Sequence, residues 1–242
     1  MPLVNVLDWR TGRGWIVLAG NALNADEDND VDLDIEAQAL TKLSMGEPIA
    51  YIYAASGDAD AAEQHLESLD EMGAPTGYLV DILTEDSQSV RRQIREAGMV
   101  LLADGPDVDA LRAGLQGTAA ASMAEAHDRG AVIFGVGAGA AVLGAHLDGT
   151  RGLAWLEDAI IMTGIEDDER MEMLRVALED RPECYGIGIG SRSAIAFGSH
   201  GEIEIWGERQ VTVLLGQDAA ARAQAKIAAL AQAQAASEGG EN

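Results

Sequence analysis

Residues 131–149, AVIFGVGAGAAVLGAHLDG, combine an apolar strand, a glycine-rich turn and a helix of small residues. With this strand–turn–helix arrangement, α/β hydrolases hold a nucleophile at a sharp, strained bend. Small residues suit the bend because the chain turns tightly and the helix then packs close to the sheet. The first N–H groups of such a helix stabilise an oxyanion. The central residue, Gly137, has no side chain, so the stretch predicts the bend without its nucleophile.

Other reactive side chains lie further along the chain. Ser191 and Ser193 follow a predicted strand end and flank Arg192. Together they could bind a carboxylate or phosphate, but a turn into the next strand is the simpler interpretation. The one cysteine, Cys184, excludes an internal disulfide and any cysteine-based metal cluster. Because it precedes a predicted strand, we expect a quiet, partly buried thiol.

The four histidines do not have the positions expected of a catalytic base. His65 and His127 lie on predicted amphipathic helices, and His200 lies in a predicted hairpin turn. His146 lies nine residues after the bend, which places it two or more turns along the helix predicted there. We expect all four to be surface or packing residues.

An acidic loop contains Asp26, Asp28 and Asp30. An EF-hand calcium loop would need Gly at its sixth position and Glu at its twelfth. Val31 and Ala37 occupy those positions, so the motif fails. We expect a solvated acidic loop and no metal site, with these three aspartates as the only weak candidates.

Short apolar runs alternate with amphipathic helical stretches. The predicted strands are Trp15–Ala19, Ile49–Ala54, Tyr78–Leu83, Met99–Ala103 and Ala131–Phe134. The predicted helices are Asp34–Leu43, Ala59–Met72, Ser87–Ala97, Asp107–Leu115 and Thr118–Ala126. Apolar strands separated by helices indicate βαβ units around a parallel sheet that is buried on both faces. We predict a doubly wound, mainly parallel α/β fold, whose ligand sites lie at the carboxyl ends of the strands.

The pattern changes near residue 185. Short strands at Tyr185–Ile189, Ser193–Phe197, Glu202–Trp206 and Val211–Leu215 are joined by turns that contain glycine. They predict an antiparallel C-terminal extension at the edge of the sheet. An Ala/Gln-rich helix, Asp218–Ala236, and a polar tail follow. We therefore divide the chain into an α/β domain, residues 1–216, and a helical tail, residues 217–242.

The composition limits the choice of partners. The 242 residues include 41 acidic and 16 basic ones, for a formal net charge of −25. The electrostatic field of so negative a protein repels phosphate backbones and anionic lipids. We therefore expect neither nucleic-acid nor membrane partners. No apolar run is long enough for a signal peptide or a membrane span, which predicts a cytoplasmic protein.

Six segments, in order, resemble the cyanophycinase and dipeptidase E family of serine peptidases. Residues 135–140, GVGAGA, are similar to its nucleophile motif G-T-S-A-G-A. The other similar segments are Tyr51–Ser56 (YIYAAS), Ala97–Asp107 (AGMVLLADGPD), Leu111–Thr118, Gly149–Leu156 and Tyr185–Ile189 (YGIGI). The resemblance covers roughly residues 14–216 and implies a flavodoxin-like or class I amidotransferase-like core.

The resemblance also implies where catalytic residues should be. The serine falls on Gly137, the histidine base falls on or near Gly164, and the acidic pair falls on Gly190 and Ser191. The oxyanion loop G-G-D-Q is altered to residues 104–107, DGPD, where Pro106 has no N–H. We therefore expect no catalytic residues. The resemblance implies that a vestigial pocket remains at these positions. Its expected lining is Gly105, Asp107, Gly135, Gly137, Ala138, Gly139, Ser191 and Arg192.

Three functions follow as hypotheses. The first is an inactive relative that assembles as a homo-oligomer, for example a dimer, or that pairs with an active paralogue or another protein and regulates it. The second is a divergent peptidase, amidase or cyanophycinase rebuilt around Ser191, Ser193 or Asp107. The third is a module that binds a small molecule or anion in the vestigial pocket. We expect no cofactor. The substrates that the resemblance implies, aspartate-rich peptides or cyanophycin, fit poorly because arginines such as Arg170, Arg175 and Arg192 are scattered in the sequence.

Overall fold

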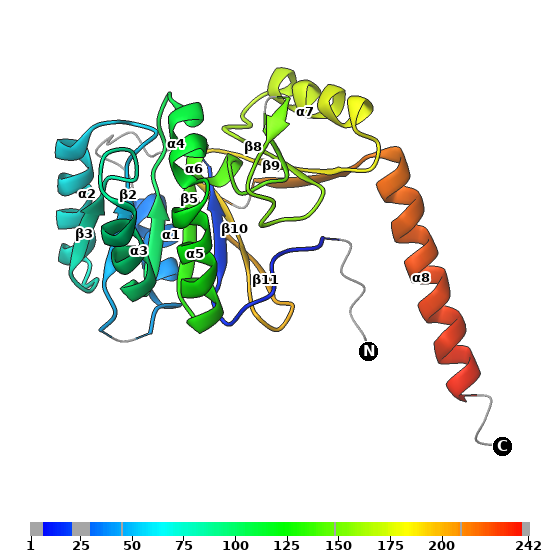
Figure 1. The fold of residues 1–242 in the computed structure, drawn as a ribbon. Helices are drawn as coiled ribbons and strands as arrows, with labels where there is room; N and C mark the ends of the chain where they lie inside the picture. Colours follow the sequence, from blue (N-terminus) through cyan, green and yellow to red (C-terminus); the bar gives the residue numbers. More distant parts are fainter. Residues whose placement is uncertain (1–6, 21–29, 45, 148, 209, 239–242) are drawn as a thin grey trace.

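The structure of the protein is a computed structural model that describes residues 7–20, 30–44, 46–147, 149–208 and 210–238 (Figure 1). Two sheets form its body. A seven-stranded sheet has the strand order β11-β10-β1-β5-β4-β2-β3, and a five-stranded sheet has the order β12-β9-β8-β6-β7. The family resemblance and the predicted doubly wound α/β class agree with this architecture.

Five parallel strands form the centre of the first sheet. They are β1 (Ile16–Ala19), β2 (Ile49–Ile52), β3 (Gly77–Val80), β4 (Met99–Leu102) and β5 (Val132–Val136). All five lie within or next to predicted strands. β1, β2, β4 and β5 are buried along their whole length, as their apolar sequences predict for a sheet covered on both faces.

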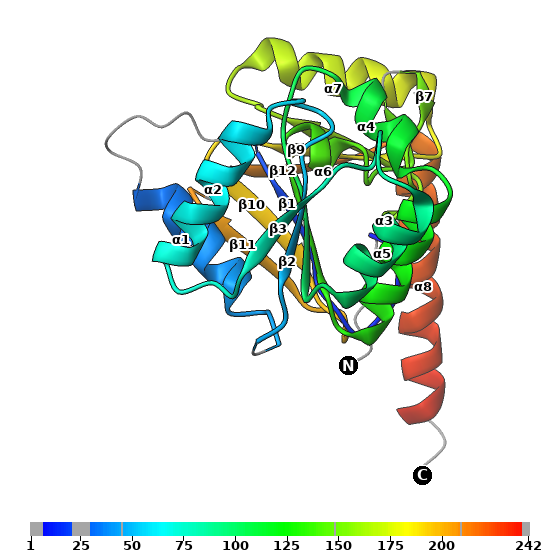
Figure 2. The ribbon, with the colours of Figure 1, turned by 60° about the vertical axis from the view of Figure 1, so that its left-hand side comes forward.

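Helices cover the two faces of this sheet (Figure 2). On one face lie α1 (Asp30–Leu40) and α2 (Ala59–Glu71), and on the other lie α3 (Ser87–Glu96), α4 (Val108–Leu115) and α5 (Thr118–Arg129). The strand residues alternate between the two cores: Ile16 and Leu18 pack with α3, α4 and α5, whereas Val17 packs with α1 and α2. The sheet therefore separates two apolar core layers.

The predicted antiparallel extension is divided between the two sheets. β10 (Ser193–Phe197) and β11 (Ile203–Gly207) extend the first sheet beside β1. β9 (Tyr185–Ile189) and β12 (Val211–Leu215) belong to the second sheet, where β9 is parallel to β8 (Ala159–Thr163). The prediction of one extended sheet was wrong in this respect, because β8 was not foreseen and offers β9 a parallel partner.

The second sheet packs against a short helix, α6 (Ala138–Ala141). The remaining strands are β6 (His146–Leu147) and β7 (Thr150–Arg151), and α7 (Asp168–Asp180) covers the outer face. On the inner face, Ile161 and Ile187 join the same core as Val142 and Leu143, which follow α6. The helix after the bend therefore lies between the two sheets.

The last helix, α8 (Gln217–Glu238), leaves the body and extends outward (Figure 1). Its first turns are held by the buried Ala219 and Ala223 and by an ion pair of 3.3 Å from Arg222 to Asp158. Within the described residues, no helix is both long and apolar enough to cross a membrane.

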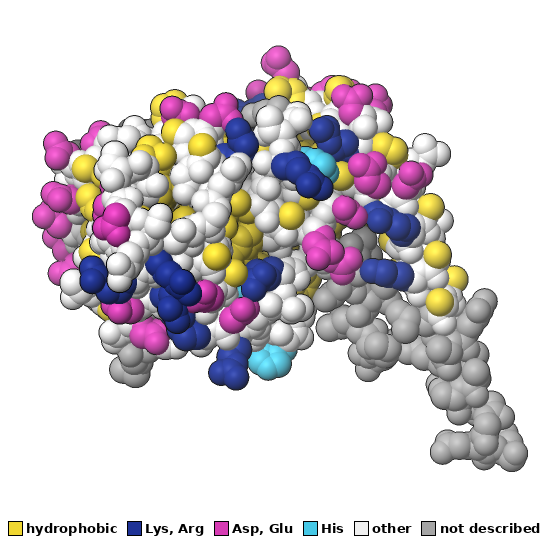
Figure 3. Space-filling model, in the orientation of Figure 1, with side chains coloured by type: hydrophobic (Ala, Val, Ile, Leu, Met, Phe, Trp, Pro, Cys, Tyr) yellow, Lys and Arg dark blue, Asp and Glu magenta, His cyan; other side chains and the backbone are white. Residues whose placement is uncertain are grey.

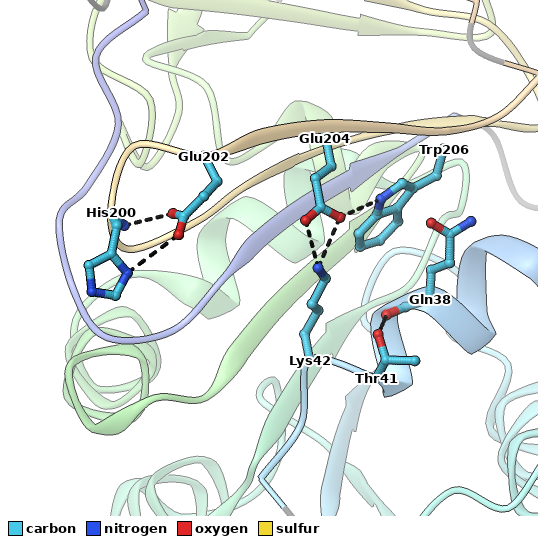
Figure 4. A network of polar contacts seen from close by, with 7 residues as sticks. All are labelled: Gln38, Thr41, Lys42, His200, Glu202, Glu204 and Trp206. Carbon is cyan, nitrogen blue, oxygen red and sulfur yellow. Dashed lines mark hydrogen bonds and ion pairs between the residues drawn. The ribbon is translucent and has the colours of Figure 1, made fainter. Parts of the chain in front are cut away.

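Lys42 ties the segment after α1 to strand β11 (Figure 4). Its Nζ lies 2.8 and 2.9 Å from the two carboxylate oxygens of Glu204, and the indole N–H of Trp206 donates to the same carboxylate at 2.9 Å. The ammonium also lies 4.0 Å from the ring centroid of Trp15. Hydrogen bonds from Lys42 and Trp206 lower the pKa of Glu204. The network fixes α1 against the edge of the first sheet.

Candidate functional site

The structure places Gly137 at the bend between β5 and α6. Its backbone has φ +53° and ψ −113°, a conformation that side chains of L-residues rarely adopt. Its N–H donates to the carbonyls of Ala19 and Gly20 at 3.2 and 2.9 Å, at the end of β1. Its own carbonyl accepts from Ala141 at 3.0 Å. This is the strained strand-to-helix bend of the hydrolase pattern.

Close packing explains the small residues on either side of the bend. A β-carbon at Gly139 would overlap the backbone carbonyl of Leu102, at the end of β4. Ala140 is fully buried. Because no larger side chain fits there, α6 rests directly on the ends of the parallel strands.

The decisive group at the bend is the carboxylate of Asp104. Its Oδ1 accepts from the backbone N–H of Ala138 and from that of Gly105, each at 2.8 Å. In the hydrolase pattern, the residue after the nucleophile and a second loop supply the two N–H groups of the oxyanion hole. A β-carbon at Gly137 would overlap this carboxylate. The Asp104 carboxylate therefore bonds to the two N–H groups at the positions of that pattern and fills the space of a side chain at residue 137.

Strand register explains why Asp104 meets the bend. Leu102 of β4 lies opposite Gly135 of β5. Asp104 and Gly137 each lie two residues further on, so they come side by side just beyond the two strands. Residues 104–107 depart from the family motif in sequence, but the contact of Asp104 with the bend was not predicted. The signal was an acidic residue where the family resemblance has glycine, directly after a strand that neighbours the bend.

The other positions of the resemblance lie at the same end of the molecule. The last pair of the β8–β9 ladder lies directly before Gly164 and Gly190. A β-carbon at Gly20 would overlap the Gly190 carbonyl and lie 3.1 Å from Ser191 Cα, and the Gly20 carbonyl accepts from the Gly137 N–H. A row of backbone contacts thus connects these strand ends. Three of the four positions are glycines: Gly137, Gly164 and Gly190.

Two of the three candidates for a rebuilt site, Ser193 and Asp107, have other roles in the structure. Ser193 is fully buried in β10, and its hydroxyl accepts from the N–H of Gln210 at 2.9 Å. Asp107 caps α4 by accepting from Ala110 at 2.8 Å. Arg192 lies 3.4 Å from Glu208 in an ion pair, and Ser191 lies beside it in the turn between β9 and β10.

The prediction that His146 lies on a helix was wrong. α6 ends at Ala141, because the chain then leaves to pair with β8, where the N–H of Ala145 donates to Ala159 at 2.8 Å. His146 begins strand β6 instead. It pairs with Ile160, whose side chain packs under α7, and it lines a cleft of about 330 Å³ together with Arg170 of α7 and Arg181, which follows that helix.

The remaining histidines pack or lie on the surface. His65 bridges Tyr51 and Glu36, with Nδ1 3.0 Å from the tyrosine hydroxyl and Nε2 2.6 Å from the carboxylate. His127 is 1% exposed, and burial lowers its pKa to about 4. The side chain of His200 is 85% exposed in the β10–β11 turn. These three agree with their predicted surface or packing roles.

The remaining candidates from the sequence are Cys184 and the acidic loop. Cys184 is buried, and burial raises the pKa of its thiol to about 11. Asp26 and Asp28 lie outside the described residues, and Asp30 begins α1. The acidic loop therefore stays a prediction.

The arginines are less scattered than the sequence suggested. Arg170 and Arg181 line the cleft that contains His146. A second group lines a groove of about 1090 Å³ at α3 and α5, and comprises Arg91, Arg92, Arg95 and Arg129. Basic side chains also gather in these two regions in Figure 3. The groove is partly neutralised, since Glu125 lies 3.2 Å from Arg91 and 2.6 Å from Arg95.

Comparison with known protein families identifies the chain. The sequence profile of Peptidase family S51 matches residues 16–204. The chain belongs to peptidase family S51. The matched span begins at β1, contains the bend at Gly137 and ends in β11.

Two solved structures share the S51 fold of this chain. A peptidase from an acI-B1 Actinobacterium aligns with a TM-score of 0.66 and 18% identity, over 85% of this chain and 93% of that chain. A putative peptidase E protein from Listeria monocytogenes EGD-e aligns with a TM-score of 0.54 and 14% identity, over 83% and 97%. At these identities the likeness shows the fold alone. A search of curated proteins found no match.

Proposed function

We propose that this S51 chain is non-catalytic and acts as a structural, assembly or regulatory protein. The observation that carries the proposal is the Asp104 carboxylate, which accepts from both N–H groups that a tetrahedral intermediate would need. A second negative charge could not share that position without strong repulsion. The glycines at residues 137, 164 and 190 supply neither nucleophile, base nor acid.

The two alternative functions have less support. A rebuilt hydrolase would need a reachable nucleophile beside a base. Ser193 is fully buried, and its hydroxyl already bonds to the Gln210 N–H. An anion-binding module at the bend would have to displace the Asp104 carboxylate from Ala138 and Gly105.

Serine labelling tests the proposal directly. The wild-type protein, incubated with a fluorophosphonate probe and assayed with aspartyl peptides and simple esters, should show neither labelling nor turnover. An active S51 peptidase serves as the positive control. Labelling that disappears in Ser191→Ala or Ser193→Ala would overturn the proposal in favour of a rebuilt site. A rise in melting temperature with added phosphate that is lost in Gly105→Pro would favour the anion-binding module instead.

Two edge strands support an assembly role with a second copy of the chain as the partner. Among the described residues, β11 and β12 are outer strands of the two sheets, and each has one side without a strand partner. They expose Ile203, Ile205, Val213 and Leu215 by 39–43%. Edge strands with exposed apolar side chains readily pair with another chain. Two copies related by a two-fold axis would cover both edges. Light scattering should then give twice the chain mass of 25.4 kDa, and a monomer would contradict this partner.

A further inference from the structure

Three side chains with different donor atoms converge near the start of β9. His146 lies on β6, whereas Glu183 and Cys184 lie directly before β9. A ring nitrogen of His146, a carboxylate oxygen of Glu183 and Sγ of Cys184 all lie within 4.8 Å of one another. The Sγ–Oε1 distance is 3.9 Å. None of these residues lies in the bend, and the proposed function does not depend on any of them.

The backbone holds the three side chains in place. The strand pairs of His146 with Arg151 and with Ile160 fix it from both sides. The N–H of Cys184 donates to the Arg181 carbonyl at 3.0 Å, and its carbonyl accepts from Gly216 at 2.9 Å. Cys184 is fully buried, Glu183 is exposed and His146 is half-buried. The group is therefore pre-arranged and open to solvent on one side.

From this geometry we propose that His146, Glu183 and Cys184 form a zinc site. Three atoms no more than 4.8 Å apart share a point within about 2.8 Å of each, and zinc bonds of about 2.0–2.3 Å need only a small further approach. The exposed Glu183 side chain can supply that movement by a rotamer change.

The donor set selects the metal. A thiolate with an imidazole suits zinc and disfavours magnesium and calcium, which prefer oxygen ligands. The carboxylate and the thiolate together balance the two charges of the ion. Three protein ligands leave a fourth position for water, as in catalytic zinc sites. The exposed Glu183 and the half-buried His146 leave that position open to solvent.

The site could not be foreseen from the cysteine count. The expectation of no metal rested on the failed EF-hand match of the acidic loop and on the single cysteine, which rules out sites with several thiolates. His146 lies 37 residues before Glu183, and only the parallel pairing through β8 brings the two together.

Cobalt titration tests the site, since Co²⁺ replaces Zn²⁺ and reports sulfur ligation. Full-length protein, freed of metal with a chelator, should bind one Co²⁺ with a thiolate-to-cobalt charge-transfer band in the near ultraviolet. Added Zn²⁺ should abolish the band. Cys184→Ala should remove the band, and His146→Ala should weaken binding by about 10–100-fold. Glu179→Gln and His200→Ala are matched controls that should change neither.

Several outcomes would overturn the zinc site. One is wild-type protein that binds Co²⁺ without the band, which would place the metal on other ligands such as the acidic loop. Another is equal Co²⁺ affinity in Cys184→Ala and wild type. The wild-type spectrum alone decides the matter if the Cys184 variant fails to fold. Neither outcome bears on serine labelling, so this inference and the proposed function fail separately.

Discussion

The carboxylate of Asp104 lies where the side chain of residue 137 would begin, and it takes up the N–H groups of Ala138 and Gly105 at 2.8 Å each. As it is oriented, the carboxylate leaves no room for a side chain at residue 137. Any side chain there would have to displace the carboxylate from these two N–H groups.

A double-mutant cycle tests this exclusion. Gly137→Ser alone should lower the free energy of unfolding by about 2–4 kcal/mol, because positive φ is costly and the new side chain overlaps Asp104. Asp104→Gly alone should cost about 1–3 kcal/mol through two unpaired N–H groups. The double variant should cost at least about 1 kcal/mol less than the sum, as measured by urea unfolding. Strict additivity would contradict the overlap.

His127 predicts an acid-dependent loss of stability. Its folded pKa is about 4, whereas the unfolded chain has the ordinary value of 6.5. The unfolded state therefore binds more protons between these values, and the free energy of unfolding falls as pH drops from about 6.5 to about 4. The full effect is about 3 kcal/mol.

The measurement for His127 is urea unfolding at several pH values. His127→Phe keeps an aromatic ring against Trp155 and should flatten the pH dependence in this window. His200→Gln, at an exposed histidine, should leave it unchanged. Equal pH dependence in wild type and His127→Phe would contradict the buried, neutral imidazole.

The chain has two lysines, and they offer a matched comparison. Lys42→Met should lower the free energy of unfolding by about 1–2 kcal/mol, because it removes the Glu204 pair and the contact with the Trp15 ring. Lys226→Met breaks only an exposed pair of 3.5 Å with Asp8 and should change it by less than about 0.5 kcal/mol. Thermal melts would show the difference, and equal effects would refute the role of the network.

The edge strands give a prediction for assembly. If β11 and β12 meet a second copy, Ile205→Lys and Val213→Lys should each convert the dimer into a monomer, since a buried ammonium without a partner is unfavourable. Leu83→Lys replaces another exposed apolar residue, 51% accessible, outside these strands and should leave the mass unchanged. Light scattering and circular dichroism separate dissociation from unfolding.

Local patterns were sufficient to predict most of the first sheet. The parallel strands are runs of apolar residues, and α2 and α3 begin after Asp58 and Asp86, whose carboxylates cap them. The bend at Gly137 could be predicted because a strand followed by glycines and small residues allows few other conformations.

What sequence patterns could not supply was pairing between distant segments. The small residues after Gly137 looked helical as far as His146, but pairing with β8 ends α6 after four residues. β8 itself, AIIMT, is a short apolar run that was missed, and without it β9 had no visible parallel partner. The meeting of Asp104 with the bend depends likewise on the register of β4 and β5.

The position of α6 between the two sheets has a consequence for descent within the family. Val142 and Leu143, just after this helix, are fully buried in a core shared with Ile161 and Ile187 of the second sheet. Selection for stability alone would preserve such a buried junction, whether or not the bend serves chemistry. The presence of the bend in a sequence therefore does not by itself indicate peptidase activity.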